Sequence, residues 1–193
     1  SVRAVRRMGN RLRAYPRVVD CQVHGLSVKV RISTEVELHR VRTYTTKEPE
    51  TLDWLRTELR DDDVYFDVGA NIGLYSLYAA RLKPGSRIYA FEPQTQTFSR
   101  LCQNLLLNGF TNIVPCCFPL SDVDTYAMFH VYDMRPGSSL HSLDGLSDWR
   151  GSGKDLVQLR QGVLAVTLDS LVRQHDLPAP TLLKVDVDGL EER

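Results

Sequence analysis

The strongest fold signal in this chain is the sequence Val64-Tyr65-Phe66-Asp67-Val68-Gly69-Ala70-Asn71-Ile72-Gly73, an apolar run that ends in an acid and two glycines. The apolar part predicts a buried strand, followed by a turn and a helix. Gly69 and Gly73 permit a tight turn and let a ligand approach the backbone, and the helix N-terminus offers unpaired amide donors. Asp67 would stand at the carboxyl edge of a sheet, where ligands bind in open α/β folds.

Strand and helix patterns alternate from this stretch onward. Strands are expected at 64–68, 87–91, 112–120 and 182–187, and helices at 74–82 and 97–107. This order predicts a parallel sheet with right-handed crossovers and helices on both faces, which is the doubly wound, Rossmann-like α/β class. Pro115 and Pro119 argue for an irregular or edge position of the third strand, because proline cannot donate to a strand ladder.

Smaller elements are expected in the flanking segments. A hairpin is predicted at 18–23 and 26–32 around His24-Gly25, a short amphipathic helix at 50–59, and an extra strand pair at 126–132 and 163–168. The Gly/Ser-rich segment 136–153 is long enough for a functional loop. Residues 189–193 should only begin a further helix, so we expect a C-terminally truncated chain. The predicted division is an N-terminal basic segment and hairpin at 1–47 and an incomplete α/β domain at 48–193.

The glycine spacing separates two classes of cofactor. The dinucleotide fingerprint needs G-x-G-x-x-G, whereas this chain has D-x-G-x-x-x-G with Asp67 at the first glycine position. A carboxylate there would repel a pyrophosphate but suits a ligand with a cationic amino-acid moiety. The pattern therefore favours S-adenosylmethionine over NAD.

A second acid ends the next predicted strand. Glu92 closes Tyr89-Ala90-Phe91-Glu92-Pro93, and it follows Gly73 by about the interval at which nucleotide-binding α/β folds place an acid on the ribose hydroxyls. An acidic strand end is by itself usually part of a polar loop. The two motifs in this order and spacing predict a ribose-binding role for Glu92.

Charged residues also interrupt the last predicted strand, in Leu183-Lys184-Val185-Asp186-Val187. Alternation places Lys184 and Asp186 on one face of a strand that is otherwise apolar. A buried charge is costly unless it is paired. One interpretation is a Lys184–acid pair that only holds the sheet, and the other places Asp186 at the carboxyl edge beside a methyl donor.

The composition narrows the class of partner. Lysine plus arginine equals aspartate plus glutamate at 24 each, so the whole-chain charge predicts no nucleic-acid partner. No apolar stretch approaches the roughly 20 residues that a membrane span needs. We expect a cytoplasmic protein, although residue 1 is Ser rather than Met, which leaves room for an upstream targeting segment.

Together these motifs resemble the FkbM-type methyltransferases. The resemblance covers roughly residue 48 to the C-terminus and rests on FDVGANIG at 66–73, AFEP at 90–93, NLLLNG at 104–109, TLDSL at 167–171 and LKVDVDGLE at 183–191. It implies a class I methyltransferase fold, S-adenosylmethionine as cofactor, and methylation of a hydroxyl on a sugar or other small molecule. The chain departs from the family at Asp188, where Glu is frequent, and in lacking the remaining strands of the sheet.

The resemblance also implies roles for single residues. It assigns the methionine-side loop to Asp67, Gly69, Asn71 and Gly73, the ribose to Glu92, and the neighbourhood of the adenine to Ser121 and Asp122. Asp186 is our candidate for the base or for orienting the acceptor, with Lys184 tuning it.

Other functions are possible on the sequence alone. Asp186, Asp188, Glu191 and Glu192 could supply oxygen ligands for Mg²⁺, but acids at a helix start more often stabilise the helix dipole, and we expect no metal. His141, Ser138 and Ser139 in the 136–153 segment are assigned no role. The alternatives to a methyltransferase are a noncatalytic nucleoside-binding remnant and an NAD-linked oxidoreductase, which the Asp67 pattern disfavours.

Overall fold

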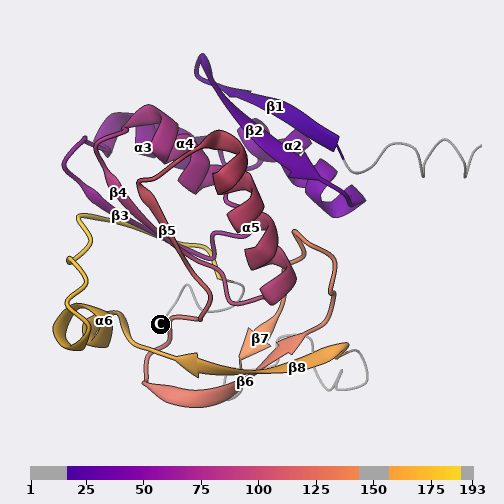
Figure 1. Cartoon of the computed structure of the whole chain (residues 1–193), viewed down its shortest axis with the longest axis vertical. Coiled ribbons are helices and arrows are strands. Elements are labelled where there is room, and N and C mark those ends of the chain that lie inside the picture. The colour runs from indigo at the N-terminus through magenta and orange to yellow at the C-terminus, as the bar shows by residue number, and fades with distance from the viewer. Residues whose placement is uncertain (1–16, 144–156, 188–193) are drawn as a thin grey trace, which may run out of the picture.

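The computed structural model of the chain describes residues 17–143 and 157–187. Its central sheet contains β3 (Val64–Val68), β4 (Arg87–Phe91), β5 (Ile113–Cys116) and β9 (Leu182–Val185), all parallel, in the order β5-β4-β3-β9 (Figure 1). The strand order reverses between β3 and β9, because β9 pairs with β3 rather than with β5. This reversal is the topological switch point at which open α/β sheets bind ligands.

Two helices cross over between the strands on one face of the sheet. They are α4 (Leu74–Leu82), between β3 and β4, and α5 (Thr95–Asn108), between β4 and β5. Side chains alternate along the strands, so Tyr65 and Ile88 enter the core under these helices, whereas Phe66 and Phe91 enter a second core with α6 (Leu168–Gln174). The prediction of a parallel sheet with helices on both faces is confirmed.

The third strand is shorter than predicted. It ends at Cys116, and the chain then leaves the sheet through Phe118 and Leu120, which pack in the second core. Within the described residues β5 is an edge strand, as its prolines suggested. An edge tolerates Pro115 because one side of the strand has no ladder to complete.

The predicted hairpin is confirmed. Strands β1 (Arg17–Val23) and β2 (Leu26–Ile32) pair antiparallel, and both residues of the His24-Gly25 turn have positive φ, as a tight hairpin requires. From α5, Asn104 accepts from the amide of Arg31 in β2 at 2.8 Å, and Asn108 accepts from the amide of Lys29 at 2.8 Å and donates to its carbonyl at 2.7 Å. The hairpin thereby shares the core under α4 and α5.

Two helices follow the hairpin. The predicted helix is present as α3 (Pro49–Glu58), with Leu52 and Leu55 buried. The helix α2 (Glu35–Lys47) was not predicted, because it is mostly polar and buries only Glu37 and Tyr44. Its start carries a local signal in the reciprocal capping box of Thr34 and Glu37.

A second, antiparallel sheet lies below the first in Figure 1 and has the order β7-β6-β8. Its strands are β6 (Thr125–Val131), β7 (Ser142–Leu143) and β8 (Leu159–Ala165). The extra strand pair is confirmed, although β8 begins four residues earlier than expected and α6 takes up the end of the predicted strand. The predicted helix at 189–193 and most of the predicted 136–153 loop lie outside the described residues. In the described part, no helix is long and apolar enough to span a membrane.

Candidate active site

A cavity opens at the carboxyl ends of the parallel strands, at the switch point. The strand ends, α2 and the segment around β7 all contribute to its wall. The lining residues are Arg40, Lys47, Val68, Gly69, Asn71, Phe91, Glu92, Pro93, Phe118, Pro119, Leu120, Phe129, Ser138, Ser139, His141, Ser142, Leu143, Asp186 and Val187. Of the residues assigned from sequence, Gly69, Asn71, Glu92 and Asp186 meet in this cavity.

Neighbouring protein atoms account for both glycines of the motif. Gly69 has φ of +78°, and a Cβ there would lie 2.0 Å from the carbonyl oxygen of Asp186. Gly73 has φ of +90° and precedes α4, and a Cβ there would lie 2.4 Å from Cδ1 of Leu101. Gly73 is absent from the cavity wall. Its role in the structure is therefore to let α4 and α5 approach each other.

Glu92 is held in the cavity wall by backbone amides. Its Oε2 accepts from the amide of Asn71 at 3.0 Å, and its Oε1 accepts from the amide of Gln94 at 2.8 Å. Burial raises the pKa of Glu92 to about 7, although the two amides and the positive charge of Arg40 oppose the shift. The carboxylate is thus fixed in place, with its remaining lone pairs available to donors in the cavity.

Asn71 links the glycine loop to the far wall. It has φ of +53°, a left-handed conformation that asparagine tolerates better than most residues. Its Nδ2 donates to the carbonyl of Ser138 at 2.9 Å, and its Oδ1 accepts from the amide of Ile72 at 2.9 Å. Asn71 therefore joins β3, Glu92 and the segment before β7.

Asp67 does not line the cavity. The parallel register places it beside Lys184, and it is fully buried. Its Oδ2 accepts from Oγ of Ser76 at 2.6 Å, and its Oδ1 lies 3.2 Å from Nζ of Lys184. The same Nζ lies 3.5 Å from Oδ2 of Asp186. We call these residues the Asp67–Lys184–Asp186 cluster, of which only Asp186 reaches the cavity.

The ammonium of Lys184 is central to this cluster. Burial lowers the pKa of Lys184, but the charges of Asp67 and Asp186 outweigh this effect and leave the pKa above its usual value. The Nζ also lies 5.0 Å from the centre of the Tyr75 ring. Lys184 and Asp186 lie on the same side of the strand, as alternation predicted. Lys184 forms a buried pair with Asp67, as one interpretation had it, and also contacts Asp186 at the cavity, as the other requires.

Ser121 and Asp122 lie beyond the cavity. The amide of Ser121 donates to the carbonyl of Val166 at 2.9 Å, and its Oγ donates to Asp122 at 3.2 Å. The cavity wall near them consists of Phe118, Pro119 and Leu120 instead. This end of the cavity is therefore mainly apolar.

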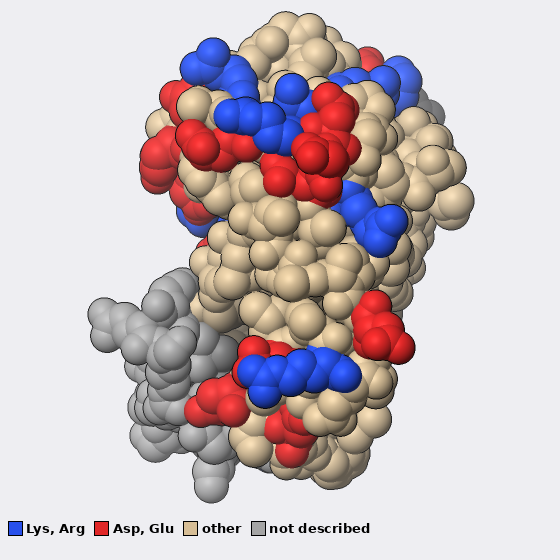
Figure 2. Space-filling view, turned by 90° about the vertical axis from the view of Figure 1, so that its left-hand side faces the viewer, with Lys and Arg blue, Asp and Glu red and all other residues tan. Residues whose placement is uncertain are grey.

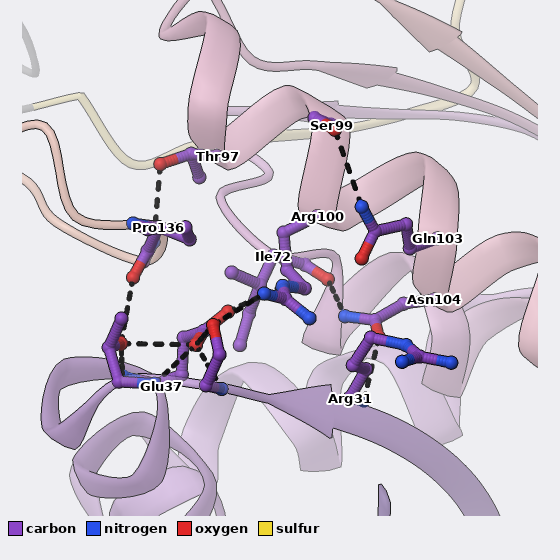
Figure 3. A network of polar contacts seen from close by, with 12 residues as sticks. Arg31, Glu37, Ile72, Thr97, Ser99, Arg100, Gln103, Asn104 and Pro136 are labelled. Atoms are coloured by element: carbon purple, nitrogen blue, oxygen red, sulfur yellow. Dashed lines mark hydrogen bonds and ion pairs between the residues drawn. The ribbon is translucent and has the colours of Figure 1, made fainter. Parts of the chain in front are cut away.

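Residues between 138 and 143, in the segment predicted as a functional loop, line the cavity, whereas sequence reasoning missed α2 and the contacts that hold the two together. Figure 3 shows these contacts: Thr34 donates to the carbonyl of Pro136 at 3.2 Å, and the amide of Gly137 donates to Thr97 of α5 at 3.2 Å. Arg40 donates to the carbonyl of Gly137. These contacts join segments that are far apart in sequence, so no local pattern could reveal them.

A buried ion pair supports this wall. Oε1 of Glu37 in α2 lies 2.7 Å from Nε of Arg100 in α5 (Figure 3). The other carboxylate oxygen of Glu37, Oε2, accepts from the amides of Ser33 and Thr34. Charged side chains in such a place are stable only when paired and hydrogen-bonded. The pair therefore fixes α2 against α5, and α2 brings Arg40 and Lys47 to the cavity.

The histidine and serine of the wall are engaged with each other. Oγ of Ser138 donates to the carbonyl of Asp133 at 2.6 Å and lies 3.1 Å from Nε2 of His141. His141 also packs edge-on against Phe129. Ser138 is a structural hydroxyl in this arrangement, because its proton is given to a backbone carbonyl.

In the described part of the chain, no cluster of three or more His, Cys, Asp or Glu side chains could hold a metal ion. Three of the four candidate magnesium ligands, Asp188, Glu191 and Glu192, lie outside the described residues.

Comparisons with known proteins point to one family. A model of the methyltransferase FkbM domain matches residues 67–193. The hexuronic acid methyltransferase AglP of Haloferax volcanii is 26% identical over 170 residues, covering 88% of this chain and 64% of that protein. The methyltransferase sdnD of Sordaria araneosa is 52% identical over 145 residues, covering 65% of this chain and 56% of that protein.

The 31-O-demethyl-FK506 methyltransferase FkbM of Streptomyces tacrolimicus is 29% identical over 154 residues, covering 70% of this chain and 59% of that protein. The chain thus spans between 56% and 64% of the length of these three relatives.

Proposed function

The chain belongs to the FkbM methyltransferase family, and from that premise we propose that it transfers a methyl group from S-adenosylmethionine to a hydroxyl group of a sugar or other small molecule. The observation that carries the proposal is the buried carboxylate of Glu92, held by two backbone amides at a switch-point cavity. Such a carboxylate can accept from both hydroxyls of a ribose.

The rest of the cavity fits the other parts of this cofactor. Phe118, Leu120 and Phe129 provide an apolar surface for the adenine ring. The backbone after β3, at Gly69 and Asn71, faces the region that we assign to the methionine moiety. The bound cofactor would supply an electrophilic methyl group on a positively charged sulfur.

Asp186 is the residue that we assign to the acceptor. Its side chain lies at the cavity and is 41% exposed, and Lys184 holds it from the buried side. In this proposal Asp186 orients the acceptor hydroxyl for in-line attack and takes its proton. Lys184 fixes the direction of the carboxylate.

The acceptor class rests on the relatives and on the surface. The relatives' names refer to a hexuronic acid and to FK506, which supports a small molecule with hydroxyl groups. On the face shown in Figure 2, basic and acidic side chains are interspersed, with no continuous basic patch. The equal numbers of basic and acidic residues in the whole chain, 24 each, likewise give no reason to propose a nucleic-acid acceptor.

Calorimetric titration tests the cofactor. S-adenosylmethionine should bind this chain saturably and NAD should not, and Glu92→Ala should weaken the binding of S-adenosylmethionine by at least tenfold, about the worth of one charged hydrogen bond. The matched control is Glu50→Ala on the exposed side of α3, which should bind like the unmodified chain. A folded chain that binds NAD, or neither ligand, would contradict the proposal.

A further inference from the structure

We propose that the Asp67–Lys184–Asp186 cluster places one negative charge at the Asp186 end of the cavity, and that Asp67 thereby favours cationic S-adenosylmethionine over its uncharged-sulfur product without touching either. The inference rests on the proposed function and deepens it. It assigns Asp67, the acid of the sequence motif, a role different from that of a direct cofactor ligand.

The position of Asp67 excludes direct contact. Asp67 is 0% exposed, and both of its carboxylate oxygens are engaged, one by Ser76 at 2.6 Å and the other by Lys184 at 3.2 Å. An ionised carboxylate at such depth must be compensated by a nearby positive charge. Lys184 is that charge, and it is itself 8% exposed.

Lys184 is shared between two acids. Its Nζ lies 3.2 Å from Asp67 and 3.5 Å from Asp186, so one ammonium faces two carboxylates. The formal charge of the cluster is therefore one negative unit. The adjacent carboxylate of Glu48 accepts from Tyr75 and is balanced by Lys47 at 2.8 Å, so that pair adds no net charge.

The excess negative charge faces the cavity through Asp186. Asp67 and Lys184 are buried on the protein side, whereas the side chain of Asp186 is 41% exposed at the cavity wall. Because charges interact strongly in a partly water-excluded site, the cluster attracts a positively charged ligand group there. Without Asp67 the ammonium would cancel Asp186, and this attraction would be lost.

Methyl transfer then changes both partners of this attraction. The S–CH₃ bond breaks with its electron pair left on sulfur, the O–CH₃ bond forms, and the hydroxyl proton passes to Asp186. The sulfur loses its positive charge and the cluster loses its negative charge in the same reaction. S-adenosylhomocysteine is therefore no longer held by charge, which favours its release.

The test compares the dissociation constants of S-adenosylmethionine and S-adenosylhomocysteine, because these ligands differ at the sulfur by one methyl group and one charge. Calorimetry on the unmodified chain gives the reference ratio. Asp67→Asn removes one negative charge and should weaken the binding of S-adenosylmethionine about tenfold relative to that of S-adenosylhomocysteine. The double variant Asp67→Asn with Lys184→Met restores the single negative charge and should return the ratio toward the reference.

Ser76→Ala is the matched control, because it removes the hydrogen bond to Asp67 and no charge. It should leave the ratio unchanged even if both ligands bind more weakly. Should the buried variants fail to fold, Asp186→Asn at the exposed end of the cluster removes the same charge and should shift the ratio in the same direction.

The outcomes separate the two proposals. A chain that binds both ligands, with a ratio that neither Asp67→Asn nor Asp186→Asn changes, overturns the role of the cluster and leaves the cofactor assignment standing. An equal shift in Ser76→Ala would also overturn it, because a structural disturbance would then explain the effect. A folded chain that binds neither ligand would instead overturn the proposed function.

Discussion

The carboxylate of Glu92 is both buried and held by the backbone at the end of β4. It is 6% exposed, and backbone amides from Asn71 and Gln94 hold both of its oxygens. Burial raises its pKa to about 7, since the loss of water costs the ionised form more than the amides return. Ligand hydroxyls would supply further donors and favour the ionised form.

This raised pKa predicts a pH dependence of stability. The ordinary pKa of Glu92 is 4.5 and the folded value is about 7, so the folded chain keeps a proton that the unfolded chain has lost. The contribution of Glu92 to the free energy of unfolding is therefore full below pH 4.5 and is lost as the pH rises through about 7. Glu92→Gln lacks this titration, so its stability relative to the unmodified chain should rise by up to about 3 kcal/mol across that range.

Urea unfolding at several pH values measures this difference. Curves for the two proteins that run parallel from acid to neutral pH would contradict the raised pKa.

The limits of sequence reasoning are clearest at Asp67. The end of the apolar run placed it near the carboxyl end of β3, where it lies, but not in the cavity that was expected there. Its partner, Lys184, comes 117 positions later in the sequence and becomes its neighbour only through the parallel pairing of β3 with β9. Whether the carboxylate of Asp67 faces a ligand or a lysine depends on that pairing, which no local sequence pattern indicates.

At the scale of elements, the turn after β3 is fitted to the extension of β9. Gly69 must be glycine because a Cβ would lie 2.0 Å from the carbonyl oxygen of Asp186. Glycine here therefore lets the backbone of Asp186 approach the end of β3, where its amide donates to the carbonyl of Val68 at 3.0 Å.

Gly69→Ala is expected to lower the free energy of unfolding by more than about 3 kcal/mol, from left-handed strain of about 1–2 kcal/mol and the added clash with the backbone. Gly25→Ala is the matched control. Gly25 has φ of +79° but no atom within 4 Å of the added Cβ, so only the strain applies there. Urea unfolding measures both variants, and equal losses would show that the contact with Asp186 costs nothing.

The elements that sequence predicted well are those rich in apolar residues. The parallel strands and α4 are apolar runs, α5 and the hairpin have regularly spaced apolar residues, and the existence of all of them was predicted with errors only at the ends. Helix α2 is mostly polar, and its buried side chains include the charged Glu37. The partner that makes this burial possible, Arg100, lies on α5.

At the scale of the whole molecule, the site is assembled from both sheets. The ends of parallel strands supply Glu92 and Asp186, and the segment joining β6 to β7 lines the same cavity. The hairpin and α2 pack against α5, so the N-terminal elements share a core with the sheet. The strand ends and the family's motifs predicted the first group of residues; the loop at 136–153 was predicted only as a segment, and its contacts with α2 and α5 are seen only in the three-dimensional structure.

The central claim is that Glu92 holds a ribose in this cavity, and a paired change in protein and ligand tests it most directly. We would measure by calorimetry the affinities of S-adenosylhomocysteine and its 2′,3′-dideoxy analogue for the unmodified chain and for Glu92→Gln. The unmodified chain should bind the dideoxy analogue about a hundredfold more weakly, because two hydrogen bonds to a charged group are lost. Glu92→Gln should discriminate far less. Equal affinities in the unmodified chain, or full discrimination in Glu92→Gln, would contradict the account.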